Sequence, residues 1–202
     1  MDLGTGDGRL PFVLARETPD RLFVGIDANA AGLGPLSGRA QRERLANLVY
    51  VRAGVESLPP ELAGIADRVT VILPWGSLLA GVARPSADVV LGIRALCRPR
   101  AALTIVLGVD ADRDRAEARR LRLPSLDERH LQGALSAAYS AAGFDVTSTR
   151  RVGPGELARW PSTWARRLAF GLTRSVLRIE AQVVESAERH PGRRPDSRRP
   201  VG

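Results

Sequence analysis

Short apolar runs alternate along the chain with longer segments in which apolar and polar positions follow a helical period. Each apolar run predicts a buried strand, and each amphipathic segment predicts a helix that covers the sheet. This alternation is typical of an α/β fold with a mostly parallel sheet and helices on both faces. The predicted strands are Asp2–Gly4, Leu22–Ala28, Leu48–Ala53, Arg68–Leu73, Ala102–Leu107, Phe144–Thr149 and Val176–Val184. The predicted helices are Leu10–Arg16, Arg39–Ala46, Pro85–Leu96 and Leu126–Ala142, with a turn and short helix at Leu58–Ile65.

Two long loops are predicted between these elements, and a tail is predicted after the last of them. Glycine-rich Asn29–Gly38 and the long connection Gly153–Gly171 predict loops. Apolar residues are almost absent at the end of the chain, which predicts one domain over residues 1–184 and a basic disordered tail over 185–202. No apolar run is long enough to span a membrane, and we expect no signal peptide. The lone Cys97 cannot form an internal disulfide, which favours a reducing cytoplasm as the location.

The charge of the chain indicates what kind of partner it binds. The net charge is +8, and every one of its Lys or Arg residues is an Arg. A guanidinium group binds phosphate through two parallel hydrogen bonds and stacks on bases. The excess positive charge therefore indicates a polyanionic partner, with nucleic acid as the first candidate. A GC-rich genome would also favour Arg over Lys, but that bias does not explain the net excess of charge.

Glycines and acids are concentrated at the start of the chain, in Asp2-Leu3-Gly4-Thr5-Gly6-Asp7-Gly8. In α/β folds, a strand that enters such a turn, followed by a helix and a second strand ending in an acid, binds a nucleoside cofactor. Asp27 supplies the second acid, which would accept hydrogen bonds from ribose hydroxyls. The fingerprint of a dinucleotide-binding site has a third Gly at the position that Arg9 occupies here. The acid before the first Gly instead resembles motif I of class I S-adenosylmethionine-dependent methyltransferases. The alternative is a purely structural glycine turn.

A second group of candidate residues follows the fourth predicted strand, in Leu73-Pro74-Trp75-Gly76-Ser77. Since ligands bind at the carboxyl ends of parallel strands, this group should share a rim with Gly4–Gly8, Asp27 and Val55-Glu56. The segment has no Asn or Asp to accept from an exocyclic amine, which favours a ring nitrogen as methyl acceptor. Trp75 would stack on a base, worth about 1–3 kcal/mol, but a Trp that covers the sheet end explains the motif equally well.

Trp and Arg are interleaved further along the chain, in Arg159-Trp160-Pro161-Ser162-Thr163-Trp164-Ala165-Arg166-Arg167. This composition suits a surface that grips a phosphate backbone while an aromatic ring stacks on a base. The alternative is an amphipathic element in which Trp164 packs against Leu168 and the Arg side chains face solvent. We interpret Trp160 as a packing residue and Trp164 as a candidate base-binding residue.

Several blocks of the chain occur in a distinctive order and spacing: Asp2–Gly8, Gly25–Ala28, Asn47–Pro59, Leu73–Leu79, Cys97–Pro99 and Ser162–Leu168. Together they resemble the Kam/Npm family of 16S rRNA adenine-N1 methyltransferases, which confer aminoglycoside resistance by methylating adenine(1408). The resemblance covers most of Asp2–Glu180 and implies a Rossmann-like class I methyltransferase domain with a mostly parallel seven-stranded sheet. The family has a segment before motif I, so we expect a truncated first strand and either a misassigned start or a missing piece.

The resemblance also implies roles for particular residues. Two Trp of the family enclose the flipped adenine and match Trp75 and Trp164, and Ser77 lies in the block that lines the target pocket. The implied cofactor-binding residues are Asp2, Gly4, Thr5, Gly6, Asp27, Glu56 and Leu58, and the implied RNA-binding residues are Arg166, Arg167 and Arg174. Adenine N1 is a nucleophile without prior deprotonation and the sulfonium methyl is already activated. Catalysis can therefore rest on positioning and on the exclusion of water.

The implied cofactor is S-adenosyl-L-methionine, and the implied partner is 16S rRNA within the 30S ribosomal subunit. We expect a monomer that uses no metal and contacts no membrane. One alternative is an inactive or non-catalytic remnant that binds cofactor or RNA. Another alternative, a small-molecule methyltransferase, is disfavoured by the net charge and by the Trp–Arg–Arg block.

Overall fold

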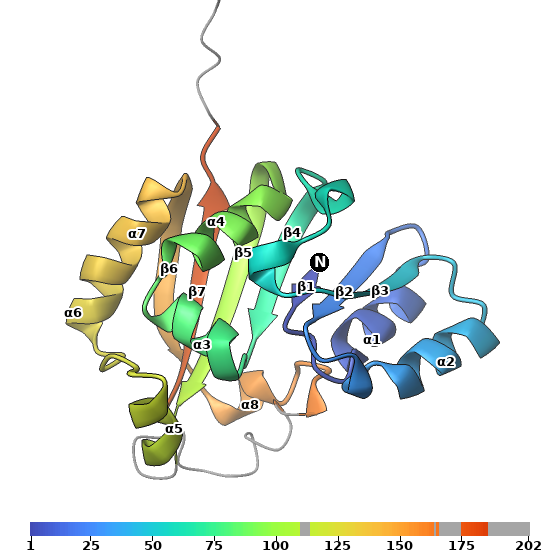
Figure 1. Ribbon diagram of the computed structural model, residues 1–202, viewed down its shortest axis with the longest axis horizontal. Helices are drawn as coiled ribbons and strands as arrows, with labels where there is room; N and C mark the ends of the chain where they lie inside the picture. The colour runs from blue at the N-terminus through green and yellow to red at the C-terminus, as the bar shows by residue number, and fades with distance from the viewer. Residues whose placement is uncertain (110–113, 164, 166–174, 186–202) are drawn as a thin grey trace, which may run out of the picture.

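One seven-stranded sheet runs through the molecule in the order β3-β2-β1-β4-β5-β7-β6 (Figure 1). The computed structural model describes residues 1–109, 114–163, 165 and 175–185. The strands are β1 (Asp2–Leu3), β2 (Phe23–Asp27), β3 (Leu48–Arg52), β4 (Ala66–Ile72), β5 (Cys97–Val109), β6 (Phe144–Val152) and β7 (Ser175–Val183). Pairing is parallel from β3 to β5, and β7 is antiparallel to both β5 and β6. The prediction of a mostly parallel seven-stranded sheet is confirmed.

Helices occupy most of the segments between the strands. They are α1 (Arg9–Glu17), α2 (Gly34–Arg42), α3 (Gly76–Ala83), α4 (Ala87–Leu96), α5 (Arg115–Arg120), α6 (Glu128–His130), α7 (Ser136–Ala141) and α8 (Pro154–Leu157). Single 3-10 turns lie at Ala30–Gly32, Val55–Ser57 and Pro60–Leu62, and a π-helical turn at Leu131–Leu135 joins α6 to α7. Within the described ranges, every helix is too short or too polar to cross a membrane.

Two apolar clusters fill the two faces of the sheet. Alternate strand residues point to opposite faces, so Val69 and Val71 of β4 belong to the larger cluster and Ile72 belongs to the smaller one. The larger cluster lies beneath α3, α4 and α7, which Figure 1 shows in front of the sheet. The smaller cluster joins Leu10 of α1 and Leu157 of α8 to the opposite face. Both faces are therefore covered, as parallel sheets require.

The structure corrects several predicted boundaries near the carboxyl rim. α2 begins at Gly34, inside the predicted loop Asn29–Gly38, because Pro35 favours the first helical turn. The predicted helix at Leu58–Ile65 is only a 3-10 turn, Pro60–Leu62. α3 was not predicted, since Gly76–Ala83 is apolar nearly all round and gives no amphipathic signal.

Strand β5 also starts earlier than the predicted Ala102. Cys97 pairs with Ala66 and Ala102 pairs with Arg68, so the register shifts between these two pairs. A bulge of this kind accommodates Pro99, which has no N–H to donate, and it accommodates Arg100 at a φ of 62°. The sequence Cys97-Arg98-Pro99 therefore opens a strand as well as ending the preceding helix.

Candidate functional site

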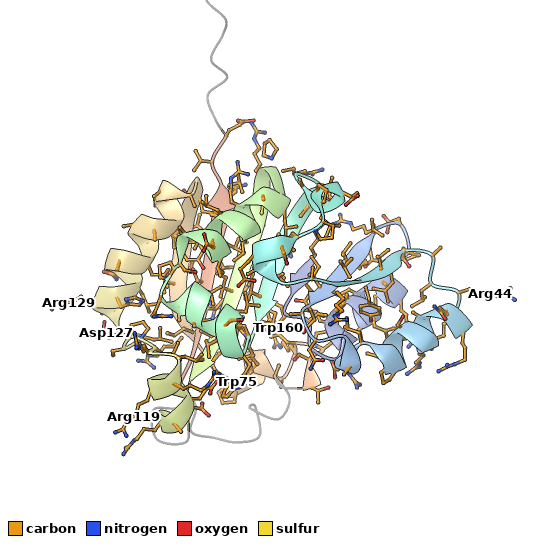
Figure 2. All side chains as sticks on the ribbon, viewed as in Figure 1. Arg44, Trp75, Arg119, Asp127, Arg129 and Trp160 are labelled. Atoms are coloured by element: carbon orange, nitrogen blue, oxygen red, sulfur yellow. The ribbon has the colours of Figure 1, made fainter. Side chains whose placement is uncertain are left out.

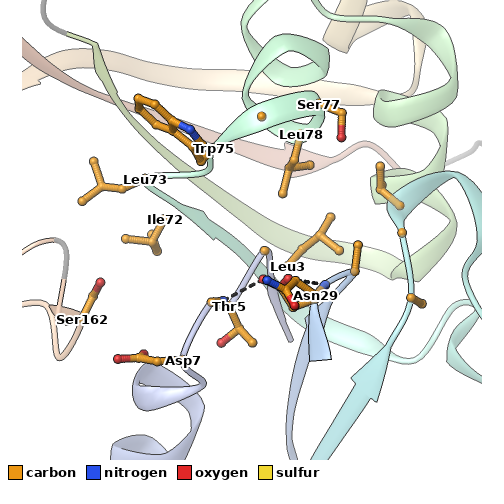
Figure 3. Close-up of a pocket in the computed structure, with 18 of the residues that line it drawn as sticks. Leu3, Thr5, Asp7, Asn29, Ile72, Leu73, Trp75, Ser77, Leu78 and Ser162 are labelled. Atoms are coloured by element: carbon orange, nitrogen blue, oxygen red, sulfur yellow. Dashed lines mark hydrogen bonds between the residues drawn. The ribbon is translucent and has the colours of Figure 1, made fainter. Parts of the chain in front are cut away.

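A cavity of about 490 Å³ opens where β1, β2 and β4 end (Figure 3). This is the carboxyl rim of the sheet, where we expected the candidate residues to lie together. Figure 3 shows two opposed walls: Thr5, Asp7 and Asn29 lie on one side and Trp75, Ser77 and Leu78 on the other. The lining residues are Leu3, Gly4, Thr5, Gly6, Asp7, Asp27, Ala28, Asn29, Ala53, Gly54, Val55, Glu56, Ile72, Leu73, Trp75, Gly76, Ser77, Leu78, Ser162 and Thr163.

The glycine-rich turn between β1 and α1 forms one wall of the cavity. Gly4, Gly6 and Gly8 have φ values of 72°, 61° and 75°, a region that residues with a side chain rarely adopt. The amides of Gly4 and Thr5 both donate to the carbonyl of Ile26, at 2.8 and 3.1 Å, which fixes the turn against β2. The glycines thus let the backbone itself line the cavity.

Tyr50 of β3 supports this turn from below. Its hydroxyl donates to the carbonyl of Gly8 at 2.7 Å. A Cβ placed on Gly8 would lie 2.5 Å from the Tyr50 ring, and a Cβ on Gly25 would lie 2.9 Å from it. Both glycines are therefore required for the close packing of β2, β3 and the turn.

Asp2, the first acid of the motif, lies beneath the turn and outside the cavity lining. Its carboxylate oxygens accept hydrogen bonds from the hydroxyls of Thr5 and Thr70, each at 2.6 Å. Burial raises the pKa of the Asp2 carboxyl, and the two hydroxyl donors oppose that rise. In this structure Asp2 orients Thr5, which does line the cavity.

Asp27, the second acid, ends β2 with its carboxylate at the cavity. One oxygen accepts from the amide of Gly6 and the other from the amide of Asn29, both at 2.8 Å. A carboxylate can accept about four hydrogen bonds, so each oxygen can still accept another. Asp27 is therefore oriented by the backbone and able to bind two adjacent hydroxyl groups.

Glu56 and Leu58 differ in their positions. Glu56 belongs to the turn Val55–Ser57 after β3 and lines the cavity, as Asp27 does. Leu58 lies outside the lining and packs, partly buried, against the larger apolar cluster. The structure thus places Glu56 at the cavity and Leu58 behind it.

Trp75 projects from a strained turn that links β4 to α3. Leu73 has a φ of 51°, which costs on the order of 1–2 kcal/mol for a residue with a side chain. Such strain clusters at functional sites because the surrounding structure must hold it. Trp75 is 53% exposed and lines the cavity, at the lower rim of the molecule in Figure 2. Ser77, in the first turn of α3, lies in the same wall.

The connection after α8 reaches the cavity at Ser162 and Thr163. The Thr163 hydroxyl donates to Asp7 of the glycine-rich turn at 2.7 Å, a contact that the sequence did not predict. Earlier in this connection, Trp160 is partly buried and packs against the smaller apolar cluster. The guanidinium carbon of Arg178 lies over the Trp160 ring, 5.8 Å from the centre of that ring. This arrangement agrees with the interpretation of Trp160 as a packing residue. Trp164, Arg166, Arg167 and Arg174 lie outside the described residues.

The cavity therefore combines two chemical environments. Oriented carboxylates and a backbone turn face one part of it, and an exposed indole with Ser77 faces the other. The first environment suits the hydroxyls of a nucleoside, and the second suits a planar ring. Two ligands of these kinds would meet within one cavity.

Comparisons with known proteins agree with this geometry. A family model described as NpmA, 16S rRNA (adenine(1408)-N(1))-methyltransferase, matches residues 1–183. An Escherichia coli protein described as 16S rRNA (adenine(1408)-N(1))-methyltransferase is 33% identical over 188 residues, or 91% of this chain and 86% of the relative. A protein of Streptoalloteichus hindustanus with the same description is 35% identical over 178 residues, or 83% of this chain and 79% of the relative.

Solved structures give the same result. A mutant 16S rRNA (adenine(1408)-N(1))-methyltransferase from Catenulisporales acidiphilia, with cosubstrate SAM, is 36% identical and has a TM-score of 0.83. That match covers 93% of this chain and 86% of the other. The aminoglycoside resistance methyltransferase NpmB1 is 39% identical with a TM-score of 0.77, covering 91% and 85% of the two chains.

Proposed function

The chain belongs to the family of 16S rRNA (adenine(1408)-N(1))-methyltransferases, and on that premise we propose how its cavity carries out the reaction. The enzyme methylates N1 of adenine(1408) with S-adenosyl-L-methionine as methyl donor, which gives aminoglycoside resistance. One observation supports a separate role for each wall, one for the cofactor and one for the target base: the cavity at one rim of the sheet has two chemically different walls.

The wall formed by the glycine-rich turn holds S-adenosylmethionine. Asp27 accepts hydrogen bonds from the ribose hydroxyls, since both its oxygens are already oriented by backbone amides. Gly4 and Gly6 let the backbone approach the ligand, and Asp2 orients Thr5 beside it. Glu56 faces the adenine moiety of the cofactor from the turn after β3, and Leu58 packs behind that turn. These residues fit a nucleoside without a pyrophosphate.

The opposite wall binds the target base. Trp75 stacks on one face of the flipped adenine, and Ser77 lines the cavity in the same wall as Trp75. We assign the other face of the adenine to Trp164 on the family resemblance. Flipping a base out of its stack costs a few kcal/mol, and stacking on each ring returns about 1–3 kcal/mol. When bound, S-adenosylmethionine would supply a methyl group on a sulfonium; the N1 lone pair can attack that group without a general base, and the thioether S-adenosylhomocysteine would leave. The two walls therefore act by orienting the adenine and excluding water.

The RNA is held by arginines that follow the second Trp in the sequence. We assign Arg166, Arg167 and Arg174 to phosphate contacts, in line with the net charge of +8. We assign as substrate the 16S rRNA within the assembled 30S subunit. Because these subunits are in the cytoplasm, the reaction is assigned to that compartment. We propose that one copy of the chain acts on one subunit, and sedimentation of the purified protein at micromolar concentration tests that assignment.

Primer extension on 16S rRNA tests the proposed function directly. Unmodified 30S subunits are incubated with the protein and S-adenosylmethionine, and a methyl group on adenine N1 stops reverse transcriptase because it blocks base pairing. We expect a stop at nucleotide 1408 that requires both protein and cofactor. A protein that binds S-adenosylmethionine but yields no stop would be a non-catalytic remnant, and methylation of small molecules alone would contradict the assigned substrate.

A further inference from the structure

A hydrogen bond between distant parts of the chain crosses one end of the cavity. The hydroxyl of Thr163 donates to a carboxylate oxygen of Asp7 at 2.7 Å, and the two residues are 156 positions apart. Both line the cavity. Asp7 belongs to the wall assigned to the cofactor, and Thr163 directly precedes in the sequence Trp164, which we assigned to the target base. This bond therefore links the cofactor wall to the segment of the chain that carries the second assigned Trp.

Asp7 is held in place independently of Thr163. Its other oxygen accepts a hydrogen bond from the amide of Arg9 at 3.1 Å, in the first turn of α1. The next residue, Gly8, caps that helix at a φ of 75° and is packed against Tyr50. A carboxylate at a helix amino terminus is also favoured by the helix dipole. Asp7 is thus a fixed acceptor that projects from the glycine-rich turn.

The chain on either side of Thr163 is also anchored. The Ser162 hydroxyl accepts from the amide of Ala165 at 3.4 Å, and Ala165 is fully buried in the smaller apolar cluster. On the other side, Trp160 donates its amide to Leu157 of α8 and packs partly against the same cluster. The bond from Thr163 to Asp7 adds to these two anchors the contact that ties this segment to the glycine-rich turn.

We propose that Asp7 and Thr163 form a positioning pair that sets the distance between the cofactor wall and the base-binding wall. The inference rests on the proposed function and concerns how its two halves are aligned. Neither residue touches a reacting atom in this assignment. Asp7 acts through Thr163, and Thr163 acts through the backbone that continues into Trp164, the next residue in the sequence. Because a small misplacement of reacting groups lowers a rate strongly, loss of the pair should reduce the chemical step.

Thr163→Val is the sharpest test, since Val keeps the branched shape and loses only the hydroxyl. Asp7 is exposed, so its freed carboxylate is hydrated and the change leaves no buried charge. A hydrogen bond to a charged group corresponds to roughly a tenfold change in equilibrium. We expect the single-turnover methylation rate, with saturating 30S subunits and cofactor, to fall about five- to tenfold. The dissociation constants for S-adenosylmethionine and for 30S subunits should change less than twofold.

Three further variants make this result specific. Thr163→Ser keeps the hydroxyl and should restore the rate to within twofold of the parent. Thr147→Val removes an exposed hydroxyl on β6 that donates to the carbonyl of Glu180 at 3.2 Å, and it should leave the rate unchanged. Asp7→Ala combined with Thr163→Val should be no slower than Asp7→Ala alone, because the pair is already broken.

Two outcomes would overturn the inference. An unchanged rate for Thr163→Val, with the melting temperature also unchanged, would show that the bond has no positioning role. An equal loss of cofactor affinity and of rate would show that the pair belongs to the cofactor site alone. Failure of the proposed function is distinct from both, since the parent protein itself would then give no stop at nucleotide 1408.

Discussion

The two walls of the cavity are built in different ways. The wall that we assign to the cofactor, called the cofactor wall below, consists largely of backbone. It has three glycines at positive φ and an acid whose two oxygens accept hydrogen bonds from backbone amides. The wall that we assign to the target base, called the base-binding wall below, consists of side chains on turns. It has an exposed Trp75 after the strained Leu73, and Thr163 of the nearby connection is held by Asp7. The backbone between β1 and α1 and the end of β2 form the first wall, whereas the second wall depends on side chains that project from connecting turns.

This difference suits the two ligands. A small cofactor needs a rigid site that exists before it binds, and backbone groups supply that without a cost in side-chain entropy. A base that must leave a folded RNA needs exposed aromatic surface, which a buried wall could not offer. Apart from Asp7, which we assign to positioning Thr163, substitutions in the first wall should therefore affect binding or stability, while substitutions in the second should affect the rate.

The largest expected effect is on cofactor binding. Asp27→Ala removes the acceptor for two ribose hydroxyls, and hydrogen bonds to a charged group contribute about 1.5–3 kcal/mol each. We expect S-adenosylmethionine to bind at least about 100-fold more weakly by isothermal titration calorimetry. Asp20→Ala, which removes an exposed acid before the amino end of β2, is the matched control and should leave the affinity unchanged. Equal affinities in both variants would remove Asp27 from the site.

The second effect tests whether the cofactor wall is part of the fold. Gly8→Ala places a Cβ 2.5 Å from the Tyr50 ring at a φ of 75°, so it combines backbone strain with overpacking. We expect urea unfolding to show a loss of about 2–4 kcal/mol. Gly64→Ala has a similar φ of 67° and meets no atom within 4 Å, so it isolates the backbone term at about 1–2 kcal/mol. If both variants lose the same amount, contact with Tyr50 is not needed.

The third prediction concerns the base-binding wall. Trp75→Ala should slow methylation of 30S subunits roughly 5- to 150-fold, the equivalent of about 1–3 kcal/mol of stacking. Cofactor affinity should stay within twofold, because Trp75 lies in the opposite wall. Trp75→Phe should retain part of the rate, since stacking needs an aromatic face rather than the indole N–H.

Trp160→Ala is the control for Trp75. It removes a ring that packs beneath Arg178 and should lower the melting temperature with little change in rate. A normal rate for Trp75→Ala, in cells challenged with aminoglycoside as well as in the assay, would make Trp75 a cover for the sheet end.

The smallest effect concerns the base of the connection, where Glu156 accepts hydrogen bonds from Arg150 and Arg178 at 2.7 and 2.8 Å. These two arginines lower the pKa of Glu156 from 4.5 to about 2. A lowered pKa means that the ion pairs stabilise the fold above about pH 4.5 and are lost as the pH falls toward 2. Glu156→Gln should therefore cost up to about 1 kcal/mol at pH 7 and less at pH 3, as measured by urea unfolding. A difference that does not depend on pH would show that the charge of Glu156 is irrelevant.

The cofactor wall could be predicted from the sequence because its determinants are local. Each glycine of Asp2–Gly8 is required by one backbone angle, and Asp27 ends the next strand along. The burial of Asp2 could not be predicted, because it depends on Thr70, which a parallel pairing of β1 with β4 brings to it. The motif therefore singled out Asp2 as a cofactor-binding residue but did not show that its two hydrogen bonds go to Thr5 and Thr70 within the protein.

The base-binding wall was only partly predictable. Pro74 and Gly76 around Trp75 indicated a turn, but α3 behind it gives no periodic signal because it is buried on nearly all sides. The pair Asp7 and Thr163 depends on the path of a long connection that no local pattern specifies. Contacts between exposed polar residues far apart in the sequence follow from the fold and cannot be read from residue types.

The position of β7 between β5 and β6 has a consequence for synthesis. Both neighbours leave the ribosome before β7 does, so the edges that will pair with β7 keep unpaired amides and carbonyls until β7 is translated. The connection that carries Thr163 is fixed at its far end only when β7 inserts. A nascent chain can therefore complete the glycine-rich turn early, but it cannot align both walls until translation has passed β7. An enzyme of this family, whose substrate is ribosomal RNA, thereby completes the second wall of its own site only after a ribosome has translated β7.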